Sequence, residues 1–161
     1  MTNKHLFFFL TGYLLLFFLL FPAYQYVVDP DATGYLSVAE KIAKGNYFNS
    51  INGIWSPLGS WIVAPFIRSG FNGIITAKWL NGIYGAVSLC LYFYFLKKLK
   101  INPYVEIATM FGAVLLIIHF AFSRLFGDLL QVTFLLLYLN IISSNNFGKN
   151  YKGIIWAAIV G

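Results

Sequence analysis

The stretch that decides the fold is residues 6–28, LFFFLTGYLLLFFLLFPAYQYVV, which carries no charged residue. A helix needs about 20 mostly apolar residues to cross roughly 30 Å of hydrocarbon. The apolar run is longer than the roughly 7 to 15 residues of a signal peptide, and no convincing small-residue cleavage site follows it. We therefore predict an uncleaved membrane-spanning helix.

The rest of the chain repeats this pattern. The composition is 60% hydrophobic and 10% charged, whereas a soluble domain usually carries about 25% charged residues. The predicted fold class is an all-α integral membrane protein with four to five transmembrane helices. We expect residues 1–161 to be a single module and the N-terminal fragment of a longer protein. The expected spans are residues 6–28, 74–96, 105–122 and 125–142, and an incomplete fifth at 153–161.

The basic residues suit a membrane topology better than nucleic-acid binding. The net charge is +6, but the Lys and Arg residues are scattered among apolar runs and form no basic face. Cations near the ends of spans are retained on the cytoplasmic side of a membrane. We therefore predict a cytoplasmic N-terminus and an outer loop at residues 29–73. The membrane is a bacterial inner membrane or that of the endoplasmic reticulum, and the absence of long loops favours the bacterial one. The inside cations are then Lys4, Lys97, Lys98, Lys100, Lys149 and Lys152.

The outer loop is predicted to contain two short helices that lie along the membrane surface. In residues 32–44, apolar side chains recur at three- and four-residue spacing opposite charged ones. Gly45 follows, as glycine commonly does where a helix ends. The second helix covers residues 57–67 and begins with Pro57, at a position that favours proline.

Acidic residues at the outer ends of the spans are the first candidates for chemistry. Asp29 and Asp31 directly follow the first span, either as solvated acids of a helix start or as reactive carboxylates. Asp128 lies four residues after Arg124, so the two side chains form a local ion pair or belong to a functional site. Two converging carboxylates can serve as general base and orienting partner, or share a divalent cation.

Other polar and aromatic residues have two interpretations each. Arg68 and Lys78 flank the outer end of the second span, where cations snorkel to head groups or bind a phosphate. His119 lies inside the third span without a second His or Cys nearby, which favours a hydrogen-bonded packing residue over a metal ligand. The aromatic residues Trp55, Trp61 and Trp79 fit an interfacial belt better than sugar stacking.

The order of these features resembles a known family. It runs DPDATGYLSVAEKIAKGNYF (29–48), WSPLGSW (55–61), AKWLNGIYGAVSLCLYFYFLKKL (77–99) and SRLFGDLLQVTFLLLYL (123–139). This is similar to the N-terminal module of the GT-C class of membrane glycosyltransferases. More narrowly, it resembles the family 39 type, which includes protein O-mannosyltransferases and lipid A aminoarabinose transferases.

The resemblance implies roles for individual residues. Asp31 matches the catalytic acid of the first outer loop, with Tyr35 in the position of the following tyrosine. Where many members have a second acid this chain has Ala32, and Asp29 is a candidate substitute. Asp128 matches the acid that opens the fourth span. The residues expected to bind substrate are Asp29, Tyr35, Trp55, Pro57, Lys78 and Arg124.

The implied activity is transfer of a hexosyl or pentosyl group from a polyprenyl-phosphate carrier to a lipid, glycan or protein acceptor on the outer face. Asp31 would remove a proton from the acceptor. The resemblance assigns no cofactor but leaves open a divalent cation, which would bind Asp31 and Asp128. This fragment alone is not expected to be catalytic. The alternatives are a transporter or flippase subunit and a structural membrane protein that assembles with partners.

Overall fold

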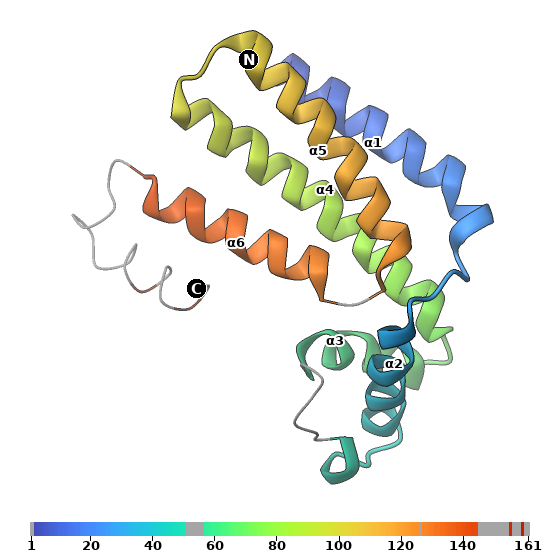
Figure 1. The fold of residues 1–161 in the computed structure, drawn as a ribbon. Coiled ribbons are helices and arrows are strands. Elements are labelled where there is room, and N and C mark those ends of the chain that lie inside the picture. The colour runs from blue at the N-terminus through green and yellow to red at the C-terminus, as the bar shows by residue number, and fades with distance from the viewer. Residues whose placement is uncertain (1, 51–56, 126, 145–154, 156–158, 160–161) are drawn as a thin grey trace.

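The computed structural model describes residues 2–50, 57–125 and 127–144, together with Ile155 and Ile159. The described residues form helices and no strand, which confirms the predicted all-α membrane fold. Figure 1 shows the long helices side by side, with the short ones beyond one end of the bundle. The elements are α1 (Asn3–Tyr24), α2 (Pro30–Ala43), the 3-10 turn η1 (Phe48–Ser50), α3 (Pro57–Arg68), α4 (Gly73–Leu99), α5 (Pro103–Ser123) and α6 (Asp128–Ile142).

Three of the described helices, α1, α4 and α5, are long and apolar enough to cross a membrane. The helix α6 is also apolar but has 15 residues, so it rises only about 22 Å, short of the roughly 30 Å hydrocarbon layer. The fourth expected span is therefore present as a shorter helix. The fifth, at 153–161, lies outside the described residues except for two helical positions, Ile155 and Ile159.

Helix α1 ends at Tyr24, four residues before the predicted end of the first span at Val28. A proline disfavours helical backbone in the residue before it. Asp29, which precedes Pro30, accordingly has extended backbone angles of φ −80° and ψ 158°. Both predicted outer helices are present as α2 and α3, and α2 ends before Gly45, whose φ of +78° suits a residue without a Cβ atom.

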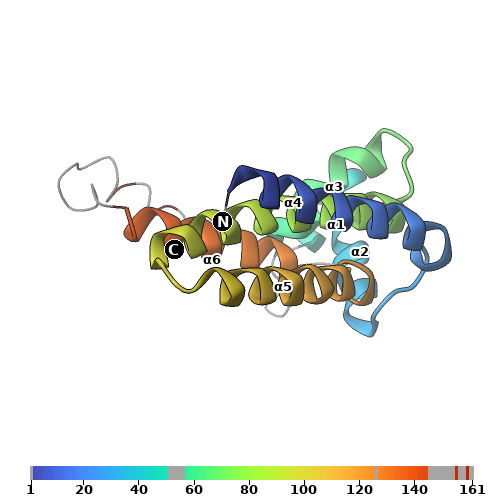
Figure 2. The same ribbon diagram turned by 90° about the horizontal axis from the view of Figure 1, so that it is seen from above.

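The core of the bundle is built on one face of α1. Phe9, Tyr13 and Phe17 recur every four residues and are buried against α4 and α5, as expected for one side of a helix. The opposite face of α1 exposes large apolar side chains, with Phe7 73% and Phe8 72% exposed. An apolar outer surface of this kind suits contact with lipid. Figure 2 shows α1 beside α4 and α5.

Small residues let α1 and α5 approach α4 closely. The Tyr13 hydroxyl donates a hydrogen bond of 3.0 Å to the carbonyl of Gly82. A Cβ atom at Gly82 would lie 2.5 Å from Cζ of Phe17, and one at Gly85 would lie 2.6 Å from Cγ2 of Ile117. Gly82 and Gly85 therefore form a helix-packing face whose partners are α1 and α5 of the same chain.

Polar contacts hold α6 against α4. The hydroxyls of Ser88 and Thr133 lie 2.9 Å apart, and the side-chain amide of Asn140 donates to the Leu91 carbonyl at 2.9 Å. Side-chain hydrogen bonds of this kind between membrane helices contribute about 0.6 kcal/mol each on average. They fix the position of α6 along α4.

A second, smaller core joins α2 and α3 to the bundle. It contains Ala32 and Ala39 of α2, Val63 of α3, Ala77 of α4, and Leu125 from the turn between α5 and α6. Leu125 is only 1% exposed. The start of α2 and the turn after α5 are therefore packed against one another at one end of the bundle.

The close contact at Gly85 can be tested with a matched glycine pair. Gly85→Ala is expected to destabilise the protein by about 1–3 kcal/mol, because the added methyl group overlaps Tyr13 and Ile117. Gly112→Ala meets no atom within 4 Å and should be neutral or stabilising by up to about 1 kcal/mol. Thermal unfolding in detergent measures both. Equal melting temperatures for the two variants would contradict the packing described here.

Candidate functional site

The turn between α5 and α6 lies at the end of the bundle next to α2 and α3 (Figure 1). The last carbonyl groups of any helix have no partner within that helix. In a chain surrounded by lipid, a backbone group without a hydrogen bond costs several kcal/mol. Three side chains from outside the turn supply partners for it: Asp29, Lys78 and Asn81.

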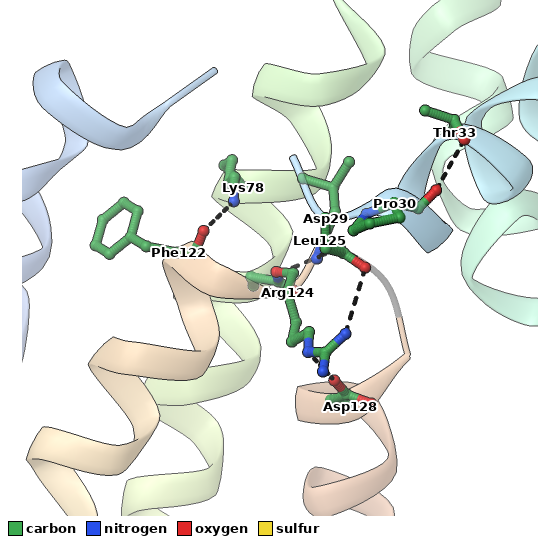
Figure 3. A network of polar contacts seen from close by, with 9 residues as sticks. Asp29, Pro30, Thr33, Lys78, Phe122, Arg124, Leu125 and Asp128 are labelled. Carbon is green, nitrogen blue, oxygen red and sulfur yellow. Dashed lines mark hydrogen bonds and ion pairs between the residues drawn. The ribbon is translucent and has the colours of Figure 1, made fainter. Parts of the chain in front are cut away.

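Lys78 reaches the end of α5 from the first turns of α4. Its side chain is completely buried, and the ammonium group donates a 2.6 Å hydrogen bond to the carbonyl of Phe122 (Figure 3). A cation is also favourable at a helix C-terminus, where the helix dipole is negative. The prediction that Lys78 snorkels to head groups or binds a phosphate is therefore wrong. The ammonium group points inward and caps α5.

Asn81 lies three residues after Lys78, on the same face of α4. Its side-chain amide donates to the carbonyl of Arg124 at 2.7 Å and to that of Leu125 at 3.2 Å. Asn81 is 4% exposed, so these bonds form away from water. Together, Lys78 and Asn81 supply partners for the carbonyls of three residues at and after the end of α5.

Asp29 binds the same turn from the opposite side. One carboxylate oxygen accepts a 2.9 Å hydrogen bond from the backbone N–H of Leu125, and the other lies 3.7 Å from the Arg124 guanidinium (Figure 3). Only 12% of the Asp29 side chain is exposed. Its negative charge also attracts the buried ammonium of Lys78. Asp29 is thus a structural acid that joins the start of α2 to the α5–α6 turn.

Arg124 lies between two carboxylates. Its guanidinium is 3.7 Å from Asp29 and 3.8 Å from Asp128, the first residue of α6. The predicted four-residue ion pair of Arg124 and Asp128 is confirmed. Both of these side chains are about half exposed, at 49% and 47%. Such a partly solvated pair contributes little stability but keeps an accessible cation in place.

Of the two carboxylates expected to share a divalent cation, Asp31 and Asp128, the second is paired with the Arg124 guanidinium at 3.8 Å. Among the residues that the structure describes, no group of three or more His, Cys, Asp or Glu side chains could hold a metal ion. The positive charge beside both Asp29 and Asp128 comes from Arg124.

Asp31 differs from Asp29 in its surroundings. It lies in the first turn of α2, is exposed, and makes no hydrogen bond or ion pair with the described residues. Tyr35, one turn later, is partly buried, and its carbonyl accepts a 2.9 Å hydrogen bond from Ser60 of α3. The Tyr35 hydroxyl lies 4.0 Å from the position that a Cβ atom would take at Gly127. The side chain of Tyr35 therefore approaches the turn that leads to Asp128.

The remaining predicted residues lie apart from this cluster. Pro57 is exposed at the start of α3, and Trp55 lies outside the described residues. Trp79 is 41% exposed and contacts the ring of Phe21. His119 is exposed on α5, with its ring at the edge of a neighbouring phenylalanine, so its prediction as a packing residue is wrong.

The fold and the site define an all-helical membrane protein with a polar cluster at one end of its bundle. No protein-family model, no curated protein and no solved structure matches the chain.

Asn81 was missed by sequence reasoning. The signal for it was a second polar side chain three residues after Lys78, at the start of an apolar span. Polar side chains in such positions commonly face a neighbouring helix rather than lipid.

The contribution of Asn81 can be measured directly. Asn81→Leu leaves the carbonyls of Arg124 and Leu125 without their partner, and an unsatisfied buried polar group costs about 1–3 kcal/mol. The melting temperature in detergent should fall by several degrees. Val87→Leu, an apolar change on the exposed side of α4, is the control. If Asn81→Leu and Val87→Leu have the same melting temperature, Asn81 does not stabilise the turn.

Proposed function

We propose that the chain belongs to a glycosyltransferase that moves a sugar from a polyprenyl-phosphate carrier to a lipid, glycan or protein acceptor. In this proposal the N-terminus is cytoplasmic and the membrane is a bacterial inner membrane. The helices α2 and α3 and the α5–α6 turn then face the outer side. The sequence resemblance to the GT-C class supplies the reaction type, and the arrangement of charges supports it.

The charged residues differ between the two ends of the bundle. The end formed by α2, α3 and the α5–α6 turn carries both acids and cations, whereas Lys97 and Lys98 close α4 at the other end (Figure 1). Cations are retained preferentially on the cytoplasmic side of a membrane, and acids contribute little to orientation. The cluster of lysines without neighbouring acids at the end of α4 supports the proposed orientation, with the end of mixed charge outside.

The observation that carries the proposal is the exposed carboxylate of Asp31. A general base must be accessible to the proton that it removes. Asp29 and Asp128 are both engaged with Arg124, whereas Asp31 makes no bond with the described residues. Of these three acids, Asp31 is therefore the one best suited to react.

In the proposed reaction, Asp31 accepts the proton of the acceptor nucleophile, which attacks the anomeric carbon of the sugar. The bond from that carbon to the lipid phosphate breaks, and its electron pair leaves on the phosphate, which inverts the anomeric configuration. Arg124 is half exposed and suited to stabilise the negative charge on the phosphate. Lys78 takes no part, because its ammonium is bound to Phe122.

The two alternative functions have less support. A transporter or flippase subunit would use ionisable groups deep within its spans, facing the protein interior. His119, the ionisable residue predicted deep in the third span, is exposed on α5. A structural protein that assembles with partners would use small residues to pack against another chain, but Gly82 and Gly85 pack against α1 and α5 of this chain. We therefore put forward no second function.

The assignment to Asp31 is tested by Asp31→Asn, which removes the proton acceptor and keeps the shape of the side chain. Sugar transfer from labelled polyprenyl-phosphate sugars should fall about 10²- to 10⁴-fold in membranes that carry the whole enzyme to which we assign this chain. Glu40→Gln, the loss of another exposed acid from α2, should leave transfer unchanged. Equal activity in the two variants would rule out Asp31 as the base. An absence of transfer by the unaltered whole protein would overturn the function itself.

A further inference from the structure

A pocket of about 390 Å³ opens between α2, η1 and α3. This volume falls in the range of about 300–1,000 Å³ that is usual for small-molecule sites. The residues that line it are mostly apolar and include two aromatic side chains. The lining residues include Ile42, Ala43, Tyr47, Trp61, Ala64 and Arg68.

This pocket is separate from the polar cluster described above. Ala43 lies twelve residues after Asp31 on α2, which is about 18 Å along the helix. None of the residues that line the pocket contacts Asp29, Arg124 or Asp128 within the described hydrogen bonds and ion pairs. We therefore consider for this pocket a ligand other than the substrates of the proposed transfer reaction.

The charge at the pocket indicates an anionic ligand. Arg68 is the charged residue among those that line it, and it lies in the last turn of α3. Its side chain is exposed and makes no hydrogen bond or ion pair with the described residues. A guanidinium group presents paired N–H donors that match the oxygens of a phosphate.

The surroundings of the pocket indicate a membrane surface. Phe48 is 91% exposed, Trp61 56% and Phe66 42%, all on η1 and α3. Aromatic side chains gather at the level of lipid head groups, and a short helix with an apolar face and nearby cations binds there. In that position the apolar lining of the pocket would contact lipid acyl chains, and the cation Arg68 would contact lipid phosphates.

We propose that this pocket binds an anionic glycerophospholipid of the surrounding leaflet. One acyl chain lies against Ile42, Ala43 and Ala64, and Arg68 binds the phosphate. The aromatic rings of Tyr47 and Trp61 cover the part of this acyl chain that is nearest the phosphate. The bound lipid fixes α2 and α3 on the membrane surface.

The test uses the whole protein in nanodiscs that contain phosphatidylglycerol with a photoactivatable group in its acyl chain. After illumination, mass spectrometry of peptides locates the label. It should lie in residues 42–50 and 57–68, and an equivalent phosphatidylcholine probe should label these residues less. Labelling elsewhere on the protein, or equal labelling by both probes, would overturn the proposal.

Two variants and a control separate a specific site from general attraction. Arg68→Gln should lower phosphatidylglycerol labelling about tenfold, the size expected for a hydrogen bond to a charged group. Ala43→Phe should block labelling by filling the pocket, with helicity checked by circular dichroism. Lys41→Gln removes a cation from α2 outside the pocket and should change nothing. An equal loss in Lys41→Gln and Arg68→Gln would contradict the proposal.

A competitor distinguishes this lipid from the proposed sugar carrier. An equimolar polyprenyl phosphate should leave the phosphatidylglycerol label in place. If it removes the label, the pocket belongs to the carrier lipid and the present inference fails, whereas the transfer reaction stays open to the Asp31→Asn test.

Discussion

The rest of the structure depends on how the exposed backbone at the end of α5 is satisfied. Phe122, Arg124 and Leu125 present carbonyl groups where the chain turns into α6, and α4 supplies a donor to each. Each such group would cost about 1–3 kcal/mol if it were buried without a partner. This requirement places the buried cation of Lys78 and the amide of Asn81 on one face of α4, directly opposite the turn.

The same requirement gives neighbouring acids different environments. Asp29 begins α2 and also accepts the N–H of Leu125, so it links the outer helices to the membrane-spanning bundle. A carboxylate held in this way is 12% exposed and neutralised by Arg124 and Lys78. Asp31, two residues later, makes none of these contacts and stays exposed. One short stretch therefore combines a buried structural acid with an exposed one.

Much of the fold could be predicted from the sequence, because apolar runs and amphipathic spacing are local properties. They predicted α1, α4 and α5, the two outer helices, and the Arg124–Asp128 pair. The inward direction of Lys78 could not be predicted, because its partner is 44 residues away and depends on where α5 ends. The hydrogen bond from Leu125 to Asp29 joins residues 96 positions apart, so local sequence patterns could not predict it either.

Hydrogen exchange at the backbone amide of Leu125 tests most directly whether Asp29 joins α2 to the α5–α6 turn. Nuclear magnetic resonance in detergent micelles can follow this amide in the unaltered protein and in Asp29→Ala. We expect slow exchange in the unaltered protein and a selective loss of protection at Leu125 in the variant, with the central amides of α5 unchanged. Rapid exchange in the unaltered protein, or the same rate in both proteins, would contradict the structure described here.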